Sequence, residues 1–167
     1  LEGVVGRRPA VVVGHSLGGV IALALAQRRP DLVRAVVAYE SPMSWCAWWP
    51  RATAGSTAMA ADGDAPAAAE RFMRRMVGDE RWEALPERTR AQRRAEGPAL
   101  VAELRSVRDP DHPPYQPALV EVPVVAAHGT ESAAHHRETA RALAAEAPDA
   151  ELVTVEGASH GVHLSHP

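Results

Sequence analysis

The chain has 167 residues and a formal net charge of -3, with 46% hydrophobic and 23% charged residues. This length suits one domain with its own core, and the acidic balance argues against the cationic surface that nucleic-acid phosphates require. Its basic residues are all arginine, which excludes Schiff-base lysines and the lysine of a P-loop. The longest apolar run, residues 20–26, is too short for a membrane span. We expect a cytoplasmic protein, with Cys46 as its single cysteine.

Four apolar runs bounded by turn-forming residues predict buried parallel strands at residues 10–13, 32–39, 122–127 and 151–155. A helical pattern at residues 17–29 lies between the first two runs, and another at 137–146 precedes the fourth. This alternation predicts an α/β fold, with a mostly parallel sheet and flanking helices.

The middle of the chain interrupts the alternation with helical patterns at residues 67–77 and around Leu100–Val107. We therefore expect a core formed by residues 1–43 and 118–167, and an inserted helical cap, or lid, at residues 44–117. Arginines of this segment could form a polyanion-binding patch, but glutamates are interleaved with them, which favours a solvated face of mixed charge. The arginines in question are Arg71, Arg74, Arg75, Arg88, Arg90, Arg93 and Arg94.

The most informative stretch is Gly14-His15-Ser16-Leu17-Gly18, where the first strand meets the first helix. A Gly-x-Ser-x-Gly pattern in this context predicts a nucleophile elbow, a sharp turn that presents the serine hydroxyl above the sheet. The turn is expected to exclude side chains at Gly14 and Gly18. Ser16 would lie at a helix N-terminus, where the Leu17 backbone N–H can stabilise an oxyanion.

At this point the chain resembles the α/β-hydrolase superfamily. The resemblance rests on the elbow at residues 14–19, the strand end at 37–42, the strand and turn at 122–129, and Gly157-Ala158-Ser159-His160. It implies that Ser16 is the nucleophile and that His160, in the turn after the last strand, is the general base. His15 matches a residue common in the family's elbow.

The resemblance leaves the triad acid open. In most members an aspartate follows the glycine that ends the penultimate strand, but Ser132 occupies that slot here. Some members carry the carboxylate at the tip of the strand after the nucleophile helix, where this chain has Glu40. Either Glu40 or Glu131 could orient the imidazole. We favour Glu40, with Glu131 as the alternative.

Two further groups of residues have competing interpretations. Trp45, Trp48 and Trp49 could line an apolar pocket above Ser16 or anchor the cap to the sheet. His160, His163 and His166 recur every three residues like metal ligands on one helical face. The resemblance already accounts for His160, so we expect neither a metal nor another cofactor.

The leading hypothesis is a serine hydrolase that acts on a carboxylic ester or a similar small acyl substrate through an acyl-enzyme. Thioesterase, aminopeptidase, C–C hydrolase and perhydrolase chemistry would use the same residues. The alternative is a non-catalytic binding protein or an inactive fragment. In the family several strands precede the elbow, so we interpret the chain as the C-terminal part of a hydrolase, with an unpaired edge at residues 10–13. The oligomeric state is left open.

Overall fold

The computed structural model describes residues 8–162. The chain forms two compact units, one comprising Leu1–Met43 with Pro113–Pro167 and the other Ser44–His112. The second boundary lies at His112 rather than at residue 117, because the segment after Pro113 packs in the sheet unit. Tyr115 is buried there, and the backbone N–H of Gln116 donates to Gln27 Oε1 at 2.7 Å.

The sheet unit contains four parallel strands in the order in which they occur in the chain. They are β1 (Ala10–His15), β2 (Val33–Tyr39), β3 (Val124–Gly129) and β4 (Ala150–Val155). The parallel α/β fold is therefore confirmed. Since all four strands run the same way, the residues that follow them, from Ser16 to His160, emerge at one edge of the sheet.

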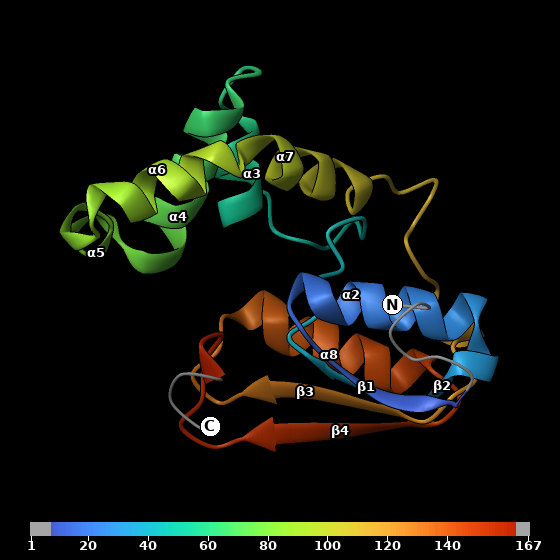
Figure 1. The fold of residues 1–167 in the computed structure, drawn as a ribbon. Helices are drawn as coiled ribbons and strands as arrows, with labels where there is room; N and C mark the ends of the chain where they lie inside the picture. The colour runs from blue at the N-terminus through green and yellow to red at the C-terminus, as the bar shows by residue number, and fades with distance from the viewer. Residues whose placement is uncertain (1–7, 163–167) are drawn as a thin grey trace. The chain divides into compact units, whose positions relative to one another are not determined.

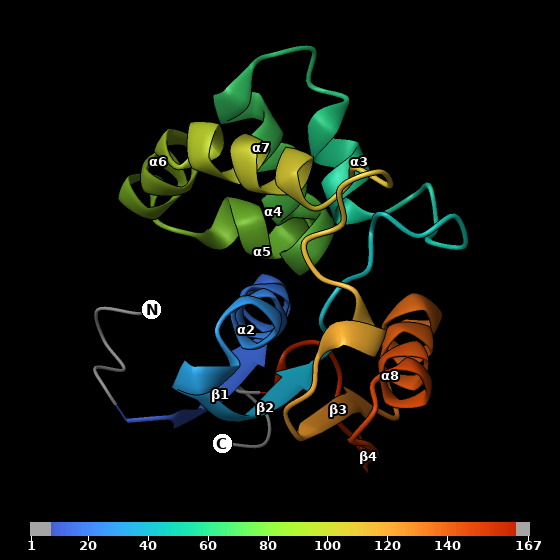
Figure 2. The same ribbon diagram turned by 90° about the vertical axis from the view of Figure 1, so that its right-hand side faces the viewer.

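Two long helices, α2 (Leu17–Arg28) and α8 (Ala134–Glu146), lie on the same face of this sheet (Figures 1 and 2). The prediction that all strands are buried is wrong for the opposite face, where Val13 is 73% exposed. Val37 and Val125 of the central strands are only half-buried there. The reason is that, among the described residues of the sheet unit itself, no helix covers that face of the sheet.

Element boundaries shift where proline removes a backbone donor. β3 begins at Val124 rather than at residue 122, because Pro123 has no N–H for the ladder and contributes only its carbonyl, which accepts from the Val36 N–H at 2.9 Å. Two short 3-10 helices, η1 (Pro30–Leu32) and η2 (Pro117–Leu119), also start at prolines. α8 begins three positions before the expected residue 137, at Ala134.

Within its described residues the second unit contains helices and no strand, and it has more helices than the two predicted. They are α3 (Ala54–Met59), α4 (Ala65–Val77), α5 (Asp79–Ala84), α6 (Glu87–Ala95) and α7 (Gly97–Ser106). Small residues of α3 and α4 form its core, with Phe72, Val101 and Leu104 packed around them. No helix within residues 8–162 is long and apolar enough to cross a membrane.

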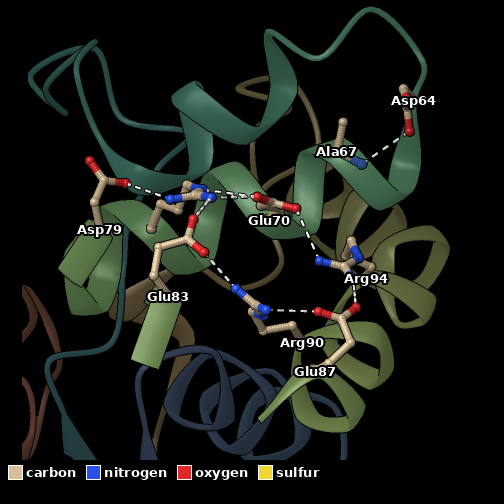
Figure 3. A network of polar contacts seen from close by, with 9 residues as sticks. Asp64, Ala67, Glu70, Asp79, Glu83, Glu87, Arg90 and Arg94 are labelled. Atoms are coloured by element: carbon tan, nitrogen blue, oxygen red, sulfur yellow. Dashed lines mark hydrogen bonds and ion pairs between the residues drawn. The ribbon is translucent and has the colours of Figure 1, made fainter. Parts of the chain in front are cut away.

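Ion pairs join three helices of this unit in a closed ring (Figure 3). Arg74 of α4 binds Glu70 and Glu83, Arg90 binds Glu83 at 2.5 Å and Glu87 at 2.8 Å, and Arg94 returns from Glu87 to Glu70. Because these arginines are neutralised by glutamates, the arrangement favours the solvated mixed-charge face over a polyanion patch.

Candidate active site

Ser16 lies in the one-residue turn between β1 and α2, with φ 54° and ψ −126°. A positive φ is unfavourable for a residue with a side chain and persists only when the surrounding structure imposes it. Here the Ser16 N–H donates to Tyr39 O and its carbonyl accepts from the Gly19 N–H, both at 2.9 Å. The strained serine at a helix N-terminus has the backbone geometry expected of an elbow. Leu17 opens α2, so its N–H belongs to the first turn, which lacks intrahelical acceptors.

The two elbow glycines differ in how tightly they are packed. A Cβ at Gly14 would lie 2.4 Å from Gly18 O and 2.5 Å from Gly19 Cα, both backbone atoms that cannot move aside. A Cβ at Gly18 would meet nothing within 4 Å. The expected exclusion of a side chain therefore holds at Gly14 and is wrong at Gly18. The neighbouring glycine, Gly19, is tightly packed instead, because a Cβ added to it would lie 2.9 Å from the side chain of Ser41.

We expect Gly14→Ala to destabilise the fold by roughly 3 kcal/mol or more, in the range of severe overpacking against backbone. Gly18→Ala is the matched control, because the added methyl enters open space and the residue is helical. Urea unfolding of the two variants checks the prediction. Equal stability of both variants would contradict it.

Glu40 is the first residue after β2 and is fully buried. Its backbone has φ 48°, and its N–H donates to Ala127 O at 2.9 Å. Both carboxylate oxygens accept hydrogen bonds: Oε2 from His160 Nδ1 at 2.7 Å, and Oε1 from the Gly129 N–H at 3.3 Å and from the Ser132 hydroxyl. Glu40 thus meets the histidine that lies 120 positions later in the chain.

The charge of Glu40 is stabilised despite its burial. Burial by itself would raise the pKa of this carboxyl, but the hydrogen bonds from His160 and Ser132 outweigh it and lower the pKa from 4.5 to about 2. The side chain is therefore a carboxylate at neutral pH. Glu131, the alternative acid, has an exposed side chain, and its N–H donates to Ala158 O at 2.9 Å.

His160 is held by the turn that follows β4. Tyr39 donates its hydroxyl to Ser159 O at 3.0 Å, and His15 Nε2 donates to His160 O at 2.7 Å. The rings of His15 and His160 are 4.5 Å apart between centroids. Since His15 is the residue before Ser16, this contact brings the imidazole of His160 beside the elbow. Glu40 engages Nδ1 of this ring and does not bind Nε2.

Ser132 stands where most family members have the acid, and its side chain contributes to the site indirectly. It is 4% exposed, its hydroxyl donates to Glu40 Oε1, and it also accepts from the Gly129 N–H at 3.1 Å. The sequence indicated only that the usual aspartate is missing. The substitution instead provides a donor to the carboxylate that reaches the site from β2.

We expect Ser132→Ala to slow any reaction at Ser16 by about tenfold, because a buried carboxylate loses one charge-assisted hydrogen bond. The carboxylate keeps its bonds to Gly129 and His160, so the fold should persist. The measurement is the rate of serine labelling by an active-site probe, with thermal unfolding as the control for folding. A labelling rate equal to that of the unsubstituted chain would show that Ser132 does not support Glu40.

His135 and His136, adjacent residues in the first turn of α8, are partly buried. The ring of His136 stacks on that of His160, with centroids 4.4 Å apart and planes 14° from parallel. Burial, followed by repulsion from His160, lowers the pKa of His136 from 6.5 to about 3. The signal that could have located it is its position, just after β3 at the edge where the strands end.

Stability should fall on acidification because of these two groups. The pKa of each is lower in the fold than in the unfolded chain, so the unfolded chain binds protons first and stability is lost as pH falls. His136 lowers the free energy of unfolding as the pH falls from 6.5 to about 3, and Glu40 does so as the pH falls from 4.5 to about 2. We expect the free energy of unfolding to drop between pH 6.5 and 4.5, and His136→Phe to flatten this part of the profile. Urea titrations across that range test it. A variant profile as steep as the original would contradict it.

Glu40, His136 and His160 also have ligand atoms within 4.8 Å of one another, the spacing of a possible metal site. Two imidazoles and a carboxylate are suitable ligands for zinc. However, each imidazole binds a metal in its own ring plane, and two stacked rings 14° from parallel do not direct their lone pairs to one point. The arrangement therefore fits ring stacking better than metal binding. His163 and His166 of the predicted metal alternative lie outside the described residues.

The tryptophans predicted near the site belong to the helical unit. Trp48 is 45% exposed, and its ring lies 6.2 Å from that of Trp49. A role for Trp45, Trp48 and Trp49 in lining a substrate pocket stays a prediction.

A model of the alpha/beta hydrolase family matches residues 1–167. The chain belongs to the alpha/beta hydrolase family. Among curated proteins it is similar to a pimeloyl-[acyl-carrier protein] methyl ester esterase of Aromatoleum aromaticum, with 32% identity over 176 aligned positions that cover 95% of the chain and 69% of that protein.

Solved structures of alpha/beta hydrolases share the fold. An enzyme from a Medee basin deep-sea metagenome has a TM-score of 0.72 at 16% identity, and the match covers 99% of this chain and 63% of the enzyme's chain. A hydrolase of Pseudomonas aeruginosa has a TM-score of 0.66 at 21% identity, with coverage of 99% and 63%. A bromoperoxidase of Bacillus anthracis has a TM-score of 0.65 at 17% identity, and the match covers 99% of this chain and 65% of the bromoperoxidase. This alpha/beta hydrolase chain thus spans less than two thirds of each of these structures.

Proposed function

We propose that this chain carries the catalytic triad of a serine esterase, with Ser16 as nucleophile, His160 as general base and Glu40 as acid. The observation that carries the proposal is the 2.7 Å hydrogen bond from His160 Nδ1 to a fully buried, ionised Glu40, beside a serine strained into an elbow. Family membership and the similarity to an esterase support the reaction class.

The contacts suggest how the proton moves. Glu40 accepts the Nδ1 proton of His160, which leaves a lone pair on Nε2 for the hydroxyl proton of Ser16. As Ser16 Oγ attacks the ester carbonyl, the imidazole becomes an imidazolium, and the buried carboxylate stabilises that charge. The Leu17 N–H and the dipole of α2 stabilise the negative charge that develops on the carbonyl oxygen.

The reaction then completes in two steps. The imidazolium returns its proton to the leaving alcohol as the acyl–oxygen bond breaks, giving an acyl-enzyme on Ser16. Water, deprotonated by His160, then attacks the acyl carbonyl. The acyl–Oγ bond breaks, the imidazolium returns its proton to Ser16 Oγ, and a carboxylic acid is released. The substrate class we propose is a small carboxylic ester, since the similar protein from Aromatoleum is named for the hydrolysis of a methyl ester.

Intact-mass labelling with a fluorophosphonate probe tests the proposal, because the probe reacts with an activated serine whatever the natural substrate is. One adduct on the chain, mapped to Ser16 by peptide analysis, would establish an activated serine, and p-nitrophenyl esters of increasing acyl length would then define the substrate class. A folded chain that takes up no probe would refute the esterase and favour a binding role for the site.

A further inference from the structure

The base of the proposed triad contacts a second imidazole that the triad chemistry does not use. His136, in the first turn of α8, lies with its ring centroid 4.4 Å from that of His160 and with the two planes 14° apart. Such a near-parallel stack covers one face of the His160 ring. The Nδ1 edge of the same ring is bound by Glu40 at 2.7 Å. His160 is thereby restrained on an edge and on a face by two different elements.

The chemical state of His136 follows from its surroundings. It lies at the N-terminus of α8, where the helix dipole disfavours a positive charge. The titratable groups that face it are His160, His135, His15 and Glu40, and burial with the repulsion from the histidines outweighs the attraction of Glu40, which lowers its pKa to about 3. At neutral pH it is an uncharged aromatic ring.

A neutral ring in this place has two effects on the base. It limits rotation of the His160 ring, which otherwise could swing Nδ1 away from Glu40 and lose the proton-transfer geometry. When His160 becomes an imidazolium, the cation also gains the face of an uncharged aromatic ring, an attractive arrangement. A charged side chain at position 136 would repel the imidazolium instead.

We propose that His136 is a positioning residue for the general base, holding the His160 ring in its bond to Glu40 and receiving the imidazolium against its face. This proposal rests on the proposed esterase function for its catalytic consequence, whereas the restraint of the His160 ring is independent of any activity.

Three substitutions at position 136 distinguish the effect of an aromatic ring face from the effects of side-chain volume and of a titratable group. His136→Ala removes the ring, His136→Leu keeps much of the volume without an aromatic face, and His136→Phe keeps the face without a titratable nitrogen. We expect the alanine and leucine variants to react with the fluorophosphonate probe about 3- to 10-fold more slowly, and the phenylalanine variant to stay within about twofold of the original chain. For an ester substrate, kcat should fall while KM is unchanged.

His135→Ala is the matched control, since His135 lies in the same turn and its ring is 4.3 Å from that of His136 between centroids, with the planes tilted by 43°. It should label at close to the original rate. Two results would overturn the proposal: an alanine variant that reacts as fast as the original chain, or a phenylalanine variant as slow as the alanine variant while both remain folded by thermal unfolding.

A second readout is independent of catalysis. In a Ser16→Ala background, the ring-proton resonance of His160 should shift when His136 becomes alanine or leucine, because the ring current of the stacked imidazole is lost, whereas phenylalanine should keep a ring-current shift. An unmoved His160 resonance in the alanine variant would overturn the positioning role. If the original chain takes up no probe but this resonance moves, the esterase proposal fails and the restraint of His160 by His136 is supported.

Discussion

Ser16→Ala should abolish fluorophosphonate labelling and lower ester hydrolysis by at least about 10³-fold, the scale seen when a serine nucleophile is removed. The hydroxyl oxygen is the atom that forms the acyl bond, and no neighbouring group can replace it in that step. The fold should persist in this variant, because the backbone hydrogen bonds of residue 16 to Tyr39 and Gly19 do not involve the hydroxyl.

The matched control is Ser41→Ala, which removes a buried serine close to the elbow. The hydroxyl of Ser41 has no hydrogen-bond partner among the described residues and lies against Gly19. This variant should label like the original chain. Persistence of the adduct in Ser16→Ala, on another residue, would show that the activated nucleophile is elsewhere.

Glu40→Gln should lower the rate by about 10³- to 10⁴-fold with the fold retained, because the amide imposes the wrong tautomer on His160. Oε1 of Glu40 accepts from the Gly129 N–H and the Ser132 hydroxyl, so the amide oxygen of glutamine will occupy that position. Its NH₂ then faces Nδ1 of His160 and donates to it. The remaining proton moves to Nε2, which can no longer accept a proton from Ser16.

Glu131→Gln is the control for this experiment, because Glu131 is the other carboxylate that the sequence offered. Its side chain is exposed and its substitution should leave the rate within about twofold of the original, as for most surface changes. Labelling rates for the two variants, measured side by side, decide which carboxylate serves His160. A large loss for Glu131→Gln with little for Glu40→Gln would reverse the assignment.

The sequence alone does not decide whether Glu40 or Glu131 lies beside His160. Both carboxylates follow a strand of the sheet, and the motif around His160 carries no information about which one it meets. The choice depends on the order β1-β2-β3-β4, which puts the end of β2 between the elbow and β3. Ser132 was visible only as a missing aspartate, and its bond to Glu40 required the two strand ends to be adjacent.

In the helical unit, the sequence predicts fewer helices than the structure contains. The sequence predicted two helices in residues 44–117, whereas the structure has five between Ala54 and Ser106. The additional ones are short or nearly without buried residues, as in α6, which has none. Their apolar periodicity is therefore too weak to detect. Ion pairs between helices join α5 and α6 to their neighbours, and a single sequence does not reveal such pairs.

By itself the sequence determined the features that depend on neighbouring residues: the strand and helix alternation, the elbow with its glycine at position 14, and the turn that carries His160. These follow from local steric and hydrophobic patterns, which act over a few residues. Only the tertiary structure decided the contacts of His160 with Glu40 and His136, and the bond from Ser132 to Glu40. Those pairs come from separate segments and meet only because parallel strands bring their carboxyl ends to one edge of the sheet.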